Sequence, residues 1–342
     1  MTEPSLTDQP VPEHDAEAAA GDAAQLAEYD AFVAASPQGT VFASSWWLDA
    51  TAGPGKWRPN IVRAAGGDIV AAWPVVVRAS RHGDVLVGAP LTPYLGPLLS
   101  PGSGRQRRSR ELEQIELLVN ALGPHAHIEA RCSPAFDYWT SLAWHGFTQT
   151  THYTWRIEDP SDETVTFAGL RNSARRQVNK ARQLGLVVEQ GSVDDLVALQ
   201  DQTFDRQGEG DRKPDEALVR RIEAAATQHD ARTILVARDT DGRVHTACMF
   251  VHDARTTWYL LGGSDTELRA SGSASLVMWE AIRAAGARGV AFDFEGSMLR
   301  HVERFVRSFG GEPAPFSIVR NTPSAAWRRR RAVATVVKRV RR

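Results

Sequence analysis

The spacing of apolar residues divides the chain into two runs of helices and strands. In the second run, alternating apolar positions predict three consecutive strands over residues 232–264, and the almost uniformly apolar segment 273–289 predicts a buried helix. A strand over 290–296, a helix over 298–311 and a last strand over 314–321 complete this run. Ahead of them we predict helices over 167–185, 193–208 and 214–228 and one short strand over 186–191.

The first run repeats this order without sequence identity. It predicts helices over 23–35, 44–53, 105–123 and 136–147, and strands over 57–65, 69–79, 127–132 and 148–158, with a further strand beginning at residue 84. Both runs contain two helices, three strands, a loop, a helix, a strand, a helix and a strand, which indicates a duplicated fold. We predict two domains of the α/β or α+β class, 25–160 and 161–322, each a mixed, mostly antiparallel sheet flanked by helices.

Composition is that of an ordinary globular protein, with 342 residues, 42% of them hydrophobic and 24% charged. The two cysteines, Cys132 and Cys248, are too far apart in sequence to suggest a disulfide framework or a cysteine-rich metal site, which fits a reducing compartment. His125 and His127 are too few for a metal site, so we expect no metal. Because no secretory signal and no long apolar stretch is evident, we expect a cytoplasmic protein.

The two ends of the chain carry opposite charge. Residues 1–24 are acidic and rich in proline and alanine, and we expect them to be disordered. The basic tail comprises residues 323–342. Within it, residues 327–342 contain eight basic residues and no acidic residue. Two interpretations are open: a solvated, frayed terminus, or an amphipathic helix that contacts nucleic acid or an anionic membrane surface, which would place the protein peripherally at the inner face of the membrane.

The loop Arg269-Ala270-Ser271-Gly272-Ser273-Ala274 lies between a predicted strand and the predicted buried helix. A serine cap at a helix start is one explanation for it. The other is a phosphate site, because the first amides of a helix lack partners and glycine lets a ligand approach the backbone. Arg269 would supply a fixed positive charge for a second phosphate oxygen.

Two acids share one face of the strand over 290–296. Asp293 and Glu295 alternate with Phe292 and Phe294, so both carboxylates point the same way. Either could hold and deprotonate an ammonium group, and their mutual repulsion would raise one pKa. We expect Glu295, which is nearer the end of the strand, to be the base or amine anchor. The alternative is a structural ion pair with an arginine of the next helix.

Further polar side chains complete the candidate site. Tyr259, on the strand before the loop, either donates a proton to a leaving group or packs on the sheet. The helix over 167–185 is basic, and its arginines and lysine form either a phosphate-binding face or a solvated surface. The candidate substrate contacts are Arg171, Arg175, Arg176, Lys180, Arg304, Arg307, Trp47 and Tyr94.

The loop resembles the Arg/Gln-x-x-Gly-x-Gly/Ala signature of the GNAT acyltransferases, in which it holds the pyrophosphate of an acyl-CoA. The segment FDFEGSMLRHVERFVRSFGGE is similar to the corresponding part of the FemABX and FemAB-like proteins. The resemblance spans residues 24–321 and is strongest over 167–311. In the first half, Leu95 and Ser100 depart from the Arg-Gly-Pro-x-x-Asp pattern of the peptidoglycan-bridge members, and only Gly96-Pro97 matches it.

This resemblance implies two GNAT-like domains in tandem and an N-acyltransferase such as an N-acetyltransferase, with acyl-CoA as the favoured co-substrate. Its acceptor would be a small-molecule or lipid-linked amine. One alternative is transfer from aminoacyl-tRNA to a cell-wall or lipid-linked amine. A second is a non-catalytic module that binds anionic lipid or nucleic acid.

Overall fold

Most helices and strands of this computed structural model follow the predicted order, but the helix predicted over 167–185 is divided at residues 170–171 and a short strand forms at 98–99, where the sequence predicts a loop. The structure describes residues 13–207, 213–296 and 299–328. The helices are α1 (Glu13–Ala35), α2 (Ser45–Thr51), α3 (Arg107–Ala121), α4 (Thr140–Trp144), α5 (Glu163–Gly169), α6 (Asn172–Gln183), α7 (Val193–Gln207), α8 (Glu216–Gln228), α9 (Ser273–Ala287) and α10 (Arg300–Val306). Short 3₁₀ turns occur at η1 (Val41–Ala43), η3 (Arg269–Ser271) and η4 (Arg307–Phe309).

The strands of the first half are β1 (Trp57–Arg58), β2 (Ile61–Arg63), β3 (Ile69–Ala72), β4 (Val75–Arg78), β5 (Val85–Val87), β6 (Leu98–Leu99), β7 (His127–Arg131) and β8 (Thr148–Ile157). Those of the second half are β9 (Val187–Gln190), β10 (Arg232–Arg238), β11 (Val244–His252), β12 (Thr256–Ser264), β13 (Ala291–Asp293) and β14 (Glu312–Asn321).

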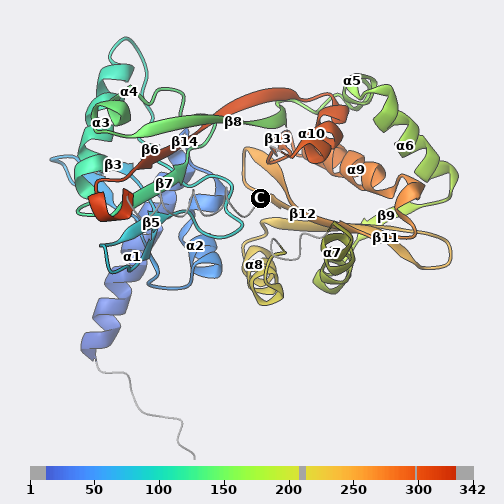
Figure 1. The fold of residues 1–342 in the computed structure, drawn as a ribbon, viewed down its shortest axis with the longest axis horizontal. Coiled ribbons are helices and arrows are strands. Elements are labelled where there is room, and N and C mark those ends of the chain that lie inside the picture. The colour runs from blue at the N-terminus through green and yellow to red at the C-terminus, as the bar shows by residue number, and fades with distance from the viewer. Residues whose placement is uncertain (1–12, 208–212, 297–298, 329–342) are drawn as a thin grey trace, which may run out of the picture.

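One continuous sheet runs through both halves. In the described part of the chain it has eleven strands in the order β1-β4-β5-β7-β14-β8-β13-β12-β11-β10-β9. The two central strands are exchanged: β8 pairs only with β13 and β14 of the second half, and β14 pairs with β7 and β8 of the first. Figure 1 shows these long strands crossing from one half to the other. The boundary predicted at residue 160 lies between β8 and α5, but it does not separate two sheets.

The predicted hairpin over 57–79 is divided between two sheets. β2 pairs with β3, as the turn at residues 66–68 predicts, and with β6 they form a separate three-stranded sheet. β1 and β4 pair with each other in the large sheet instead. Pro59 and Pro74 stand at the two breaks, where the missing N–H of proline interrupts a ladder.

Helices cover both faces of the sheet in the second half. Figure 1 shows α7 and α8 on one face and α6, α9 and α10 on the other. α9 is buried along almost its whole length because its side chains are nearly all apolar. α6 is amphipathic, and the predicted inward edge is buried: Leu170, Ala174, Val178 and Ala181.

The ends of the chain are described only in part. α1 begins at Glu13, inside the stretch 1–24 whose composition predicts disorder, because its alanine-rich sequence favours helix. Residues 1–12 and most of the basic tail, 329–342, lie outside the described residues. Within the described ranges, none of the helices has the length and the apolar run needed to cross a bilayer.

Candidate active site

The parallel strands β12 and β13 part in the middle of the sheet. They pair from Thr256↔Ala291 to Trp258↔Asp293, after which β13 ends and β12 continues. At the same point β12 has a bulge: its register with β11 jumps from Phe250↔Tyr259 to Met249↔Leu261, which leaves Leu260 without a partner. A bulge removes a residue's amide and carbonyl from the ladder and is common beside active sites. Because the pairing with β13 stops at Trp258, the β12 backbone beyond it has no partner among the described strands on this edge, and the opening has backbone polar groups on its β12 side.

Asp293 is buried completely and is held by the first half of the chain. Its Oδ1 accepts hydrogen bonds from Thr154 Oγ1 at 2.5 Å and from the Glu295 amide at 2.8 Å. Its Oδ2 accepts one from Arg156 Nη1 at 3.0 Å. The ion pair considered for this acid is thus made with Arg156 of β8 and not with Arg304 or Arg307 of the next helix. Burial raises the pKa of Asp293, although Arg156 and Thr154 lower it.

Glu295 is strained and only partly satisfied. Its φ is +59°, in the left-handed region that a side chain disfavours, and Gly296 follows at +54°. Its Oε1 is buried and has no hydrogen-bond partner in the described structure. Burial raises the pKa of the Glu295 carboxyl well above its usual value, and the charge of Asp293 raises it further, whereas Arg131 lowers it. Strain and an unpaired buried carboxyl are typical of a functional residue.

A cavity of about 430 Å³ lies beside Glu295. The loop between β5 and β6 and two residues of β7, Glu129 and Arg131, form its other walls. The first half thus supplies the cavity and the second half supplies the carboxyl.

The aromatic candidates lie in three different surroundings. Tyr94 is 2% exposed, its hydroxyl has no hydrogen-bond partner among the described residues, and its pKa is raised by burial and by the charge of Asp293. Tyr259 packs with Phe250 on the α9 side of the sheet, and burial raises its pKa. Trp47 is fully buried and donates to Thr92 Oγ1 at 3.0 Å, so it is a core side chain in this structure.

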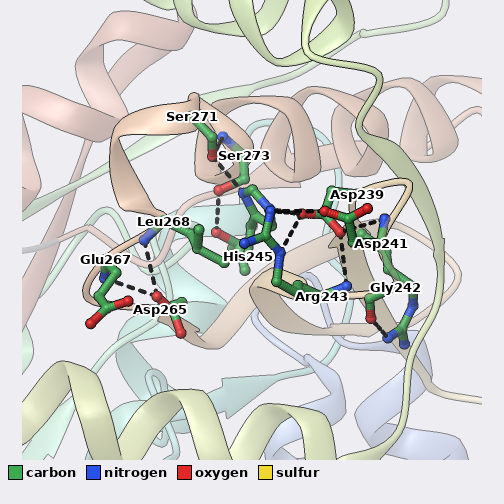
Figure 2. A network of polar contacts seen from close by, with 12 residues as sticks. Asp239, Asp241, Gly242, Arg243, His245, Asp265, Glu267, Leu268, Ser271 and Ser273 are labelled. Carbon is green, nitrogen blue, oxygen red and sulfur yellow. Dashed lines mark hydrogen bonds and ion pairs between the residues drawn. The ribbon is translucent and has the colours of Figure 1, made fainter.

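Side chains of β11, supported by Asp239 just after β10, hold the loop 269–274 (Figure 2). His245 lies between Asp239, 3.0 Å from its Nε2, and Ser271 Oγ, 2.9 Å from its Nδ1. Thr246 contacts Ser273 Oγ at 2.8 Å. The hydrogen bond from His245 holds the pKa of Asp239 well below its usual range. These hydrogen bonds therefore hold Ser271 and Ser273 of the loop in place.

Gly272 makes room for α6. Its φ is +86°, and a Cβ there would lie 2.3 Å from the backbone oxygen of Gln177. Lys180 Nζ also donates to Ala270 O at 2.6 Å. The loop pattern predicts that this glycine admits a ligand to the backbone, whereas the structure shows a close contact between helix and loop. Arg269 and Ala270 remain exposed, and Ala274 is half-buried.

Alanine at position 272 should therefore destabilise the protein more than alanine at an open glycine. Gly123 is the matched control, because its φ is +67° and a Cβ at that position would have no neighbour within 4 Å. We expect Gly123→Ala to cost about 1 kcal/mol of unfolding free energy and Gly272→Ala about 2–3 kcal/mol. Urea unfolding of the two variants measures this. Equal losses would show that the approach of α6 is unimportant.

The basic side chains of α6 are divided between structural contacts and solvent. Arg175 is tied to Ala168 O and Asn172 Oδ1. Arg171, Arg176 and Lys180 are exposed, and of these Lys180 contacts the loop. On α10 and η4, Arg304 is exposed and Arg307 pairs with Glu303 at 3.0 Å. The described residues contain no group of three or more histidine, cysteine or acidic side chains arranged for a metal ion.

Residues 168–312 match the family model described as an acetyltransferase (GNAT) domain. This match covers less than half of the chain and identifies that part as a GNAT-like acyltransferase domain. No curated protein matches the chain in sequence.

The whole chain is similar in fold to solved tandem proteins. The crystal structure of FemX aligns with 85% of this chain and 95% of its own, with a TM-score of 0.66 and 13% identity. The C-terminal domain of a putative lysylphosphatidylglycerol synthetase from Agrobacterium fabrum aligns over 92% and 97%, with a TM-score of 0.55 and 13% identity. L-PGS from Bacillus licheniformis aligns over 98% and 99%, with a TM-score of 0.51 and 11% identity. The predicted tandem GNAT fold and the resemblance to FemAB-like proteins are confirmed.

Sequence reasoning missed three residues of the site. Thr154 and Arg156 hold Asp293, and Arg131 lines the cavity of Glu295. All three lie on strands with at least one neighbour from the other half, so their sequence context offers no local signal. The only local signal of these contacts is that Thr154 and Arg156 are two positions apart and therefore lie on the same face of β8.

Proposed function

We propose that this protein transfers an acyl group from a phosphate-bearing activated donor to an amine. The main support for the proposal is that Glu295 lies where the strands β12 and β13 part. There a buried, unpaired carboxyl lies next to a cavity, and β12 is bulged at Leu260. An acyl carbonyl in the opening would meet the free backbone groups of β12 on one side and the amine on the other.

The acceptor side depends on Glu295. An amine enters as an ammonium ion, and the Glu295 carboxylate takes one of its protons, for which a raised pKa makes it a better base. The neutral nitrogen then attacks the acyl carbon and forms the C–N bond. The C–S or C–O bond to the carrier breaks, and the second nitrogen proton passes to the leaving thiolate or alkoxide. Asp293 positions the backbone of Glu295 through the 2.8 Å hydrogen bond.

The donor side depends on the loop 269–274 and the exposed residues around it. Arg269 and Lys180 form a basic border, since Lys180 Nζ donates to Ala270 O of the loop, and the loop is supported by His245 and Thr246. Such a border suits the phosphates of acyl-CoA, and a helix N-terminus adds partial positive charge. The same border suits the end of an aminoacyl-tRNA, which is the second candidate donor. The basic tail, 327–342, is a further candidate contact with tRNA or an anionic membrane.

Calorimetric titration with acetyl-CoA and with aminoacylated tRNA tests the proposal. We expect saturable binding of acetyl-CoA, weakened roughly tenfold by Arg269→Ala because one charge-assisted contact is lost. The exposed Arg110 of α3 provides the control, and Arg110→Ala should bind as the wild type does.

Binding of charged tRNA alone would replace the first donor by the second. Binding of neither donor would overturn the proposal and favour the non-catalytic module.

A further inference from the structure

The cavity beside Glu295 combines apolar walls with three charged side chains. Val87, Ala89, Leu91 and Leu95 supply apolar surface from the first half. Its charged residues are Glu129, Arg131 and Glu295. At about 430 Å³ it falls in the range of small-molecule sites. It can enclose an amino acid or a short peptide, but it is small for a phospholipid.

The three charges differ in what they already contact. Glu129 pairs with Arg320 at 2.6 Å, so its charge is balanced within the protein. Glu295 Oε1 is buried without a partner. Arg131 is exposed, and its side chain makes no hydrogen bond or ion pair with any residue in the ranges that the structure describes. A solvent-exposed guanidinium and a buried, unpaired carboxylate oxygen therefore face the same cavity.

The backbone of Arg131 is fixed although its side chain is not engaged. Arg131 pairs with Ile318 of β14, and its carbonyl accepts the Leu95 amide at 2.8 Å. Because Arg131 stands on a strand inside the large sheet, the backbone from which its guanidinium extends is held in place. The side chain can therefore select a ligand by position as well as by charge. Burying such a charge beside a ligand is favourable only when the ligand brings an anion.

Resting on the acyl transfer proposed above, we propose that the acceptor carries a carboxylate as well as its amine, and that Arg131 binds this carboxylate while Glu295 receives the amine. The acceptor class is thus an amino acid or a short peptide. Both residues line the cavity and the described structure contains no direct ion pair between them, so a ligand in the cavity can contact both.

Matched acids and amides test this proposal. The probes are the common L-amino acids and the corresponding L-amino acid amides, in which the amine is kept and the carboxylate is neutralised. Binding is measured by calorimetry without a donor, and transfer is measured with acetyl-CoA by release of the free thiol. We expect at least one acid to bind roughly ten- to a hundredfold more tightly than its amide, which is the usual effect of one charge-assisted contact.

Variants of Arg131 separate a binding role from a structural one. Arg131→Gln should raise the KM of the acid roughly ten- to a hundredfold, leave kcat and the KM of the amide nearly unchanged, and remove the preference. Arg131→Lys should restore part of it, because the charge is kept and the bidentate geometry is lost. Arg110→Gln, on the exposed face of α3, is the control and should retain the preference in full.

Equal binding of acids and amides would overturn this inference and leave acyl transfer intact. Binding of phosphatidylglycerol vesicles with no binding of any amino acid would also overturn it, in favour of a lipid acceptor. The opposite pattern, selective binding of acids without transfer from acetyl-CoA or charged tRNA, would uphold the carboxylate site and refute the proposed function.

Discussion

Replacing Glu295 with glutamine should lower kcat by roughly 10²–10⁴-fold, the usual contribution of a general base. Glutamine keeps the size of the side chain but cannot take the proton of an ammonium group. The change is measured as acceptor-dependent release of thiol from acetyl-CoA. Glu116→Gln, an exposed substitution on α3, controls for the loss of one negative charge and should leave the rate unchanged. Wild-type activity in Glu295→Gln would exclude Glu295 as the base.

The same substitution should stabilise the protein, and the gain should grow with pH. The folded-state pKa of Glu295 is raised above its unfolded value, so folding favours the protonated form. Its contribution to stability is fully present below the unfolded pKa, near 4.5, and is lost as pH rises through the folded pKa. Glutamine stays neutral at every pH and avoids this loss. The melting temperatures of the two proteins should converge near pH 4 and separate toward neutral pH.

Activity should follow the opposite trend. Because the base must be ionised to accept a proton, the acidic limb of the kcat/KM profile should lie above the usual range for a carboxyl. A profile that is flat from pH 4 to pH 8 would contradict the assignment of Glu295.

Replacing Asp293 with alanine should destabilise the protein by about 3–5 kcal/mol, as expected when one partner of a buried, hydrogen-bonded ion pair is removed. The Thr154 hydroxyl and the Glu295 amide would lose their acceptor, and the Arg156 guanidinium would lose its buried partner and keep only Glu158. Asp293→Asn keeps one acceptor oxygen and removes a costly buried charge, so its loss should be smaller. Urea unfolding measures both variants.

The effects of Asp293→Ala and Arg156→Met should not add. Since they remove two ends of one contact, the double variant should lose less stability than the sum of the single variants. Additive losses would show that the pair is not coupled.

Local sequence pattern predicted most elements but could not predict the exchange of β8 and β14. The strand predicted over 148–158 is observed at Thr148–Ile157, and the one over 314–321 at Glu312–Asn321. Alternation identifies a strand and its two faces, yet it contains no information on which distant strand will pair with it. The predicted strand 290–296 ends early, at Asp293, because Glu295 and Gly296 take left-handed backbone angles.

The same limit applies to the site. Glu295 was predicted from its own strand, and the structure adds what surrounds it. Arg131 is 164 positions away in the sequence, and only the assembled sheet brings it to the same cavity. Trp47 was predicted to contact substrate but lies in the core. An aromatic residue at a helix start gives the same sequence pattern in both cases. The loop 269–274 was correctly placed before a helix, but the packing of Gln177 against Gly272 depends on α6, almost a hundred residues earlier.

The exchanged central strands restrict how substrates can enter. In many two-lobed enzymes the lobes swing apart about a flexible connection, but here such a swing would have to break the backbone ladders on both sides of β8 and β14. Donor and acceptor must instead reach their places through movements of surface loops, such as the one between β5 and β6. Substitutions in these loops should therefore change kcat. A rotation of the two halves should contribute nothing to the dependence of kcat on solvent viscosity.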